Sequence, residues 1–149
     1  MRGYKKIFVC GAVFGIDVEE SKKFDVYENV LKKLYPETEI VVPNTISQFR
    51  NDFIKANPQV SEDVVNTKMS EFDLRQVKES DCLVCDLSLL STGLGLELGV
   101  ALENRKTIFC FAKTDSKISN LVLGTFAPNG ITNYDSLDML AVQLKEKLI

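Results

Sequence analysis

Short apolar runs separated by amphipathic segments set the pattern of this chain. Four runs are almost continuous in hydrophobic side chains, and they cover residues 7–10, 39–42, 82–87 and 107–111. Runs this short and this uninterrupted are typical of strands that are buried on both faces of a parallel sheet. The pattern therefore predicts a core built on buried parallel strands.

The first segment between these runs has the periodicity of a helix. Phe24, Tyr27, Leu31 and Leu34 recur at spacings of three and four residues. They follow an acidic opening of the kind that a helix N-terminus favours. On this pattern the lysine pairs 22–23 and 32–33 are predicted to lie on the solvated face of the helix.

Further helices are predicted over 61–77, 93–103 and 136–148. Ser136 and Asp138 have the character of capping residues, so Tyr134 and Asp135 are expected to start the last helix rather than to line a site. Strands that alternate with helices imply parallel pairing through right-handed crossovers. The predicted fold class is therefore a doubly wound α/β sheet.

Two polar stretches, 43–60 and 113–133, interrupt this alternation. Neither is rich in Gly and Ser, and both carry aromatic or aliphatic side chains, so neither is typical of a linker between domains. We predict a single domain over 1–149. In it, the two stretches form loops near the carboxyl ends of the strands and supply the walls of a pocket.

Charge and composition exclude several classes of function. The 149 residues include 18 Lys and Arg against 21 Asp and Glu, a formal charge of −3. The chain lacks the basic stripe that attracts a nucleic acid polymer. It also has no histidine, which excludes a Ser-His-Asp or Cys-His nucleophile, a histidine general base and histidine-ligated zinc. Acid–base chemistry must therefore use carboxylates, Lys, Tyr or Cys.

The cysteines indicate a reducing compartment. Cys10, Cys82, Cys85 and Cys110 lie in apolar runs, where buried thiols behave as small hydrophobes. Cys82 and Cys85 have the spacing of a redox or metal motif, but side chains three positions apart on a strand point to opposite faces. No apolar run reaches the ~18 residues of a membrane span, and the apolar stretch 7–16 lacks a signal-peptide cleavage site. We expect a cytoplasmic protein with no membrane partner.

The stretch 81–101 holds the strongest candidate for chemistry. A buried strand leads through a short loop into Gly93-Leu-Gly95, which allows close approach of the backbone, and then into a helix. Glu97 is predicted to lie in the first turn of that helix, where the dipole keeps its carboxylate ionised. Such a group can act as a nucleophile or can simply satisfy the dipole. Asp86, at the end of the strand, can orient loop amides or merely precede the helix.

The residues around Glu97 resemble a known family. The run 92–106, TGLGLELGVALENRK, is very similar to the nucleophile segment of the nucleoside 2-deoxyribosyltransferases, which place a glutamate inside a G-x-G-x-E-L-G helix start. Resemblance continues in the same order along most of the chain, through 11–14, 42–43, 48–49, 72–74 and 119–124. It implies a Rossmann-like or flavodoxin-like parallel sheet of about five strands flanked by helices, and a homodimer or larger homo-oligomer.

The same resemblance implies roles for individual residues. Glu97 matches the nucleophile that attacks C1′ of a deoxyribonucleoside, and Asp73 matches an aspartate that contacts and helps to protonate the departing base. Substrate-binding positions are implied for Phe8, Gly11, Phe14, Gln48, Ser91, Gly93, Gly95, Ser119, Asn120 and Leu121. The segment 119–121 resembles one that reaches into the pocket of a neighbouring subunit. The implied reaction passes through a covalent glycosyl-enzyme, transfers deoxyribose to a nucleobase with net retention, and needs no metal or cofactor.

Two positions depart from the family pattern. The family usually has a tyrosine where this chain has Phe8, and the hydroxyl of that tyrosine orients the nucleophile. Tyr27 and Tyr134 are candidates for a replacement donor. Many transferases have an aspartate at the position of Ser91, and serine there resembles the related 2′-deoxynucleoside 5′-monophosphate N-glycosidases. A hydroxyl beside a helix N-terminus can donate to a 5′-phosphate, whereas a carboxylate would repel it.

Three functions follow from these positions. Deoxyribosyl transfer between nucleobases is the first, and hydrolysis of 2′-deoxynucleoside 5′-monophosphates is the second. The glycosidases hold phosphate with a serine and an arginine that correspond here to Ala12 and Phe14, which weakens the second interpretation. A non-catalytic nucleotide-binding module is the third, since a fold does not fix a function.

Overall fold

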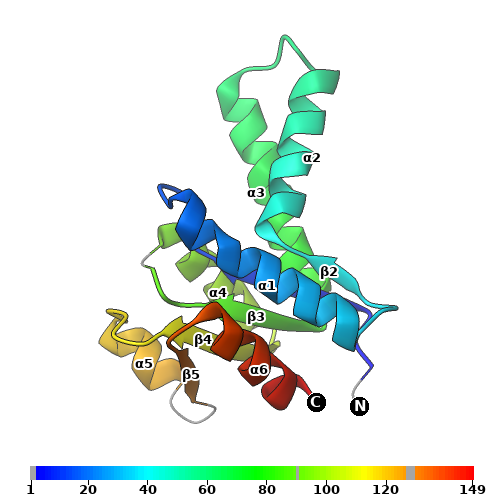
Figure 1. The fold of residues 1–149 in the computed structure, drawn as a ribbon. Helices are drawn as coiled ribbons and strands as arrows, with labels where there is room; N and C mark the ends of the chain where they lie inside the picture. The colour runs from blue at the N-terminus through cyan, green and yellow to red at the C-terminus, as the bar shows by residue number, and fades with distance from the viewer. Residues whose placement is uncertain (1–2, 90, 127–129) are drawn as a thin grey trace.

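The computed structural model describes residues 3–89, 91–126 and 130–149. Within these ranges the chain forms five strands and six helices (Figure 1). The strands are β1 (Lys6–Gly11), β2 (Glu39–Val41), β3 (Cys82–Asp86), β4 (Thr107–Lys113) and β5 (Ile131–Tyr134). The helices are α1 (Val18–Leu34), α2 (Pro43–Ala56), α3 (Glu62–Glu79), α4 (Thr92–Glu103), α5 (Asn120–Phe126) and α6 (Leu137–Leu148). The predicted α/β fold class is confirmed.

The strands form one parallel sheet in the order β2-β1-β3-β4-β5. The direction of winding therefore reverses between β1 and β3. In sheets of this order, ligands bind in the crevice beyond the carboxyl ends of the strands at that reversal. Gly11, the last residue of β1, lies beside Asp86, the last residue of β3. These two residues mark the place where a site is expected.

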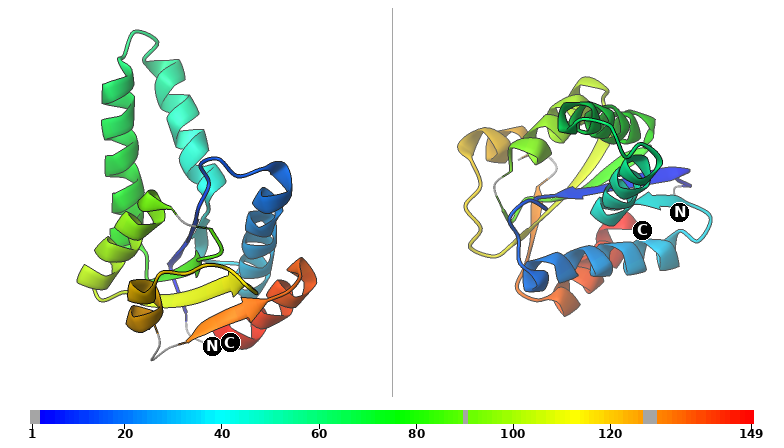
Figure 2. Two further views of the ribbon diagram at one scale, coloured as in Figure 1. Left: turned by 90° about the vertical axis from the view of Figure 1, so that its left-hand side faces the viewer. Right: turned by 90° about the horizontal axis from the view of Figure 1, so that it is seen from above.

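Helices cover both faces of the sheet (Figure 2). One hydrophobic cluster joins β1 and β3 to α1 and α6, and it includes Tyr27, Leu31 and Leu140. The other joins the opposite face of the sheet to α3, α4 and α5. The cysteines are free and buried. Cys82 belongs to the first cluster and Cys85 to the second, so their predicted placement on opposite faces is confirmed.

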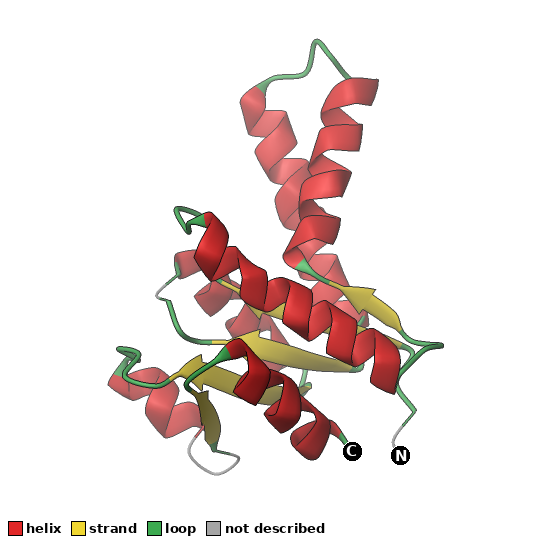
Figure 3. Ribbon diagram, in the orientation of Figure 1, coloured by secondary structure: helices red, strands yellow, loops and turns green. Residues whose placement is uncertain are grey.

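Helix α2 corrects the prediction of a loop over 43–60. With α3 it forms a helical hairpin that extends away from the sheet (Figure 3). None of its residues is buried, which explains why its polar composition is not that of a core helix. The Phe49 ring stacks on Phe72 of α3, with ring centroids 3.8 Å apart and an interplanar angle of 3°. Aromatic contact between the two helices therefore takes the place of burial in the core.

The second polar stretch, 113–133, is also partly ordered into elements. It holds α5 and the start of β5, an edge strand whose Thr132 and Asn133 give it little hydrophobic signal. Tyr134 is the buried last residue of this strand, so the prediction that it starts the last helix was wrong. Helix α6 begins at Leu137, and the Ser136 hydroxyl accepts a hydrogen bond from the Met139 amide at 3.1 Å. No described helix has the length and apolar character that crossing a membrane requires.

Candidate active site

Glu97 lies on the second turn of α4. It is the sixth residue of this helix, and the first turn contains no acidic residue. The prediction that it lies in the first turn was therefore wrong: the helix starts at Thr92 and Ser91 caps it. The Ser91 hydroxyl accepts a hydrogen bond from the Leu94 amide at 3.2 Å. The field of a helix dipole falls off within the first turn, so it does not hold Glu97 ionised.

A small pocket next to Glu97 joins four elements of the fold. It has a volume of about 120 Å³, and β1 ends in its wall, at the sheet edge where a ligand is expected. Its lining residues are Phe8, Val9, Cys10, Gly11, Val13, Pro43, Ile46, Ser47, Arg50, Met69, Asp73 and Glu97. The pocket therefore brings together both predicted catalytic residues and two of the predicted substrate-binding residues, Phe8 and Gly11.

The two carboxyl groups in the pocket share a hydrogen bond. Burial raises the pKa of both, and the neighbouring Asp73 charge raises the pKa of Glu97 further, to about 9. The hydrogen bond from Glu97 opposes the rise at Asp73. Asp73 Oδ1 is buried and has no hydrogen-bond partner among the described residues. The pair therefore holds one proton near neutral pH. Because the two groups titrate together, that proton is assigned to the pair and not to either residue.

Phe8 leaves Glu97 without a hydroxyl donor from β1. The ring of Phe8 is only 2% exposed and lines the pocket of Glu97. The two tyrosines considered as replacement donors are both engaged elsewhere. Tyr27 and Tyr134 donate to Asp86 Oδ2 at 2.7 and 2.8 Å. The hydrogen bond that Glu97 makes within the pocket is therefore the one that it shares with Asp73.

Gly11 is needed where β1 approaches α1. A Cβ atom at this position would lie 2.9 Å from the Phe24 ring and 3.4 Å from the Asp86 side chain. Gly11 therefore lets the end of β1 lie close to both neighbours. Gly93 and Gly95 are exposed on the first turns of α4. Added Cβ atoms there would meet no protein atom closer than 3.7 Å, so packing within this chain does not require glycine at either position.

The other predicted substrate-binding residues lie outside the Glu97 pocket. Ser91, Gly95 and Ser119 line a separate hollow of about 70 Å³. Phe14 is 99% exposed and Leu121 is 80% exposed. Asn120 is exposed at the start of α5, and Gln48 is exposed on α2. None of these residues lines the pocket of Glu97 in the same chain.

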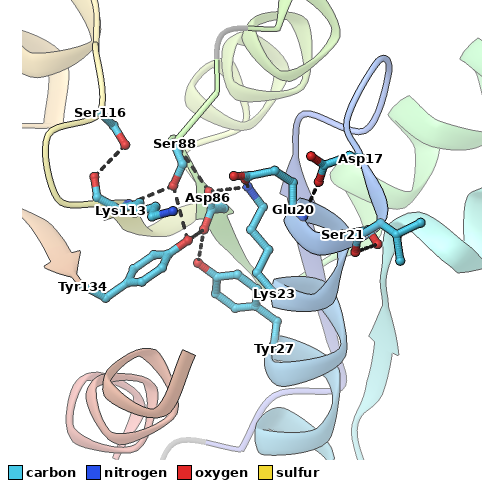
Figure 4. A network of polar contacts seen from close by, with 11 residues as sticks. Asp17, Glu20, Ser21, Lys23, Tyr27, Asp86, Ser88, Lys113, Ser116 and Tyr134 are labelled. Atoms are coloured by element: carbon cyan, nitrogen blue, oxygen red, sulfur yellow. Dashed lines mark hydrogen bonds and ion pairs between the residues drawn. The ribbon is translucent and has the colours of Figure 1, made fainter. Parts of the chain in front are cut away.

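Asp86 is the centre of a buried polar network (Figure 4). Besides the two tyrosines, it accepts the Ser88 amide at 3.1 Å, and the Lys23 ammonium lies 3.1 Å from Oδ1. Asp86 is 0% and Lys23 is 3% exposed. Lys23 therefore contradicts the prediction of a solvated face, although its neighbour Lys22 is exposed and pairs with Glu19. Asp86 orients a loop amide next to β1, as one of its two sequence interpretations proposed.

Sequence reasoning missed the part of the pocket that the α2 helix supplies. Pro43, Ile46, Ser47 and Arg50 come from α2, and Met69, also missed, comes from α3. A signal was present, because 43, 46, 47 and 50 have the i, i+3, i+4, i+7 spacing of one helix face. It was overlooked because the polar stretch 43–60 was interpreted as a loop.

The chain resembles known proteins in sequence and in fold. No protein-family model matches it. A putative 2′-deoxynucleoside 5′-phosphate N-hydrolase of Nematostella vectensis is 24% identical over 128 residues, or 85% of this chain and 80% of the relative. The solved CMP N-glycosidase of Clostridium botulinum has a TM-score of 0.66 at 15% identity, covering 95% of this chain and 99% of that one. A 2-deoxyribosyltransferase of Bacillus psychrosaccharolyticus has a TM-score of 0.62 at 18% identity, covering 91% and 90%.

The resemblance to the nucleoside 2-deoxyribosyltransferase family is confirmed. The two solved structures show that the fold of this family extends over nearly the whole chain. Of these three similar proteins, two are named for N-glycosidic hydrolysis and one for deoxyribosyl transfer.

Proposed function

We propose that this chain cleaves the N-glycosidic bond of 2′-deoxyribonucleosides and transfers the deoxyribosyl group to a second nucleobase. The main support is the pair of carboxyl groups, Glu97 and Asp73, which share a proton in a largely apolar pocket. Glycosidases that retain configuration use such a pair, one carboxylate as nucleophile and one acid for the leaving group. Glu97 is the nucleophile and Asp73 is the acid.

The shared proton prepares both groups for their roles. In the free protein it is shared between the two carboxyl groups, whose pKa values are both raised by burial. As the bond from C1′ to the base lengthens, positive charge on the sugar stabilises the Glu97 carboxylate, and the proton moves to Asp73. Asp73 then gives that proton to the base nitrogen while a Glu97 oxygen forms an ester with C1′.

A second base completes the reaction. Its nitrogen attacks C1′ from the face opposite Glu97, the ester breaks, and the two displacements give net retention. The proton that the incoming base loses returns to the carboxyl pair. Water in place of the base gives hydrolysis. Apolar walls such as Ile46 and Met69 exclude water and so favour transfer.

Hydrolysis of 2′-deoxynucleoside 5′-monophosphates is the second candidate. Ser91 supports it, because its hydroxyl accepts from the Leu94 amide and keeps its own proton to donate to a phosphate. The Nematostella vectensis relative, which is named for that reaction, supports it as well. Ala12 and Phe14 provide no phosphate donors from their side chains, which is why transfer is the first candidate.

A product screen tests the two reactions against one another. The purified chain is incubated with deoxynucleosides or their 5′-monophosphates, with and without adenine or hypoxanthine, and the products are separated by chromatography. Exchange of the free base into a deoxynucleoside, with configuration retained, is the result expected for transfer. Release of base from the monophosphates alone would favour hydrolysis. No release from either class of substrate would contradict both candidates.

We also propose that the chain acts as a homo-oligomer. The resemblance places 119–121 at the pocket of a neighbouring subunit, and these residues are exposed here and lie outside their own Glu97 pocket. Their exposure supports a role that depends on a second copy.

Tyrosine in place of Phe8 is expected to raise turnover. A hydroxyl on β1 would donate to the Glu97 carboxylate, favour its ionised form and lower its pKa. A hydrogen bond to a charged group of ordinary strength corresponds to about a tenfold gain in rate. Steady-state rates of Phe8→Tyr and of the parent chain at neutral pH measure this gain. An unchanged or lower rate would show that the pocket orients Glu97 by another group.

A further inference from the structure

One face of α2 is turned to the pocket of Glu97. Four of its residues line the pocket at the spacing of a single helix face, namely Pro43, Ile46, Ser47 and Arg50. Gln48 lies off this face, and its side-chain amide donates to Asp52 Oδ1 at 2.9 Å. The residue that the resemblance assigned to the base is therefore directed away from the pocket. Arg50 and Ser47 are the polar side chains that α2 contributes instead.

Arg50 is available to a ligand. It is the one cationic side chain among the described residues that line this pocket. It forms no ion pair within 4.0 Å with a carboxylate of the described chain. A guanidinium carries five N–H donors in a planar fork and no acceptor. The group can therefore bind a ligand edge that presents acceptors side by side.

The proposed reaction directs the base of a substrate toward α2. An entering carboxylate and a departing base lie on opposite sides of the anomeric carbon. Glu97 reaches the pocket from α4, whereas Ser47 and Arg50 reach it from a separate helix. With C1′ next to Glu97, the base therefore extends away from α4 and meets the pocket face of α2.

Resting on the proposed function, we propose that Arg50 reads the edge of the nucleobase and selects 6-oxopurines. Guanine and hypoxanthine present O6 and N7 as adjacent acceptors, which a guanidinium binds through two N–H donors. Adenine presents an amino donor beside N7, so one N–H of Arg50 would face another donor. The substrates are therefore 2′-deoxyguanosine and 2′-deoxyinosine, either free or as 5′-phosphates. Ser47 can donate to or accept from the same base edge.

Binding measurements separate this selection from turnover. Calorimetry with the Glu97→Gln chain, which cannot form the ester, gives the affinities for deoxyinosine and deoxyadenosine, and in parallel for their 5′-monophosphates. Within each pair the sugar and phosphate are the same, so the ratio of affinities reports on the base alone. We expect the oxopurine to bind about tenfold more tightly or better.

Arg50→Gln in the same background is expected to bring that ratio below one, because a glutamine amide matches the N6 and N7 edge of adenine. Lys55→Gln is the control: it removes one positive charge from the same helix, and Lys55 does not line the pocket. This control should keep the ratio. Equal affinities, a ratio unmoved by Arg50→Gln, or no binding of either compound would overturn the assignment of Arg50. Selective binding without any turnover by the parent chain would support Arg50 and overturn the proposed reaction.

Discussion

Glutamine in place of Glu97 is expected to abolish deoxyribosyl transfer. The amide cannot form an ester with C1′, and it cannot pass a proton to Asp73. The loss of a nucleophile costs a factor on the order of 10⁴ or more in rate. Product chromatography of Glu97→Gln measures the loss, and Glu103→Gln is the matched control because Glu103 is an exposed residue at the end of the same helix. Retention of more than about a tenth of the activity by Glu97→Gln would contradict the assignment.

The same substitution is expected to make the chain more stable than the parent at high pH. Burial and the neighbouring Asp73 raise the pKa of Glu97 from 4.5 to about 9. The stability that depends on protonated Glu97 is therefore fully present below about pH 4.5 and is lost as the pH rises toward 9. Glutamine stays neutral throughout, so Glu97→Gln should melt about 5 °C or more above the parent at pH 9 and near it at pH 4.5. If variant and parent have the same Tm as each other at pH 9 as well as at pH 4.5, Glu97 ionises in the folded chain without a loss of stability.

Asparagine in place of Asp86 is expected to destabilise the chain by about 3–5 kcal/mol. The substitution keeps the shape of the side chain but leaves the buried Lys23 ammonium without its anionic partner at 3.1 Å. It also weakens the hydrogen bonds from Tyr27 and Tyr134. Urea unfolding measures the change in free energy.

A second substitution distinguishes the loss of the ion pair from a general defect. Lys23→Met removes the stranded charge, so the double variant with Asp86→Asn should recover part of the lost stability. If Asp86→Asn costs less than about 1 kcal/mol, or if Lys23→Met adds its full cost to that of Asp86→Asn, the network does not act as described.

The strands and the main helices could be predicted because their signals are local. Buried parallel strands require continuous apolar runs, and the predicted runs at 7–10 and 82–87 lie on β1 and β3. Helix α2 could not be recognised in the same way, since its stabilising contact is Phe49 against Phe72 on another helix. Strand β5 lies at the sheet edge, where polar residues are tolerated and the hydrophobic signal is weak.

The motif around Glu97 is contiguous in sequence, and Asp73 was proposed separately from the resemblance of 72–74. The structure places both in one pocket, and their roles stay predictions. The state of these two groups was not predictable. It depends on the hydrogen bond between α3 and α4 and on the burial of both carboxyls. The burial of Lys23 was missed for a similar reason, since its partner Asp86 is 63 residues away in the sequence. An ion pair between residues of two different elements produces no periodic pattern in the sequence of either element.

The most direct test of the account is to trap the sugar on the protein. A 2-fluoro-substituted deoxynucleoside analogue slows the breakdown of a glycosyl ester, so the adduct can be digested and located by peptide mass mapping. We expect the added mass on the peptide that contains Glu97, and its absence in Glu97→Gln. An adduct on another side chain, or base exchange that proceeds at full rate with no trapped sugar, would contradict the claim that Glu97 is the nucleophile.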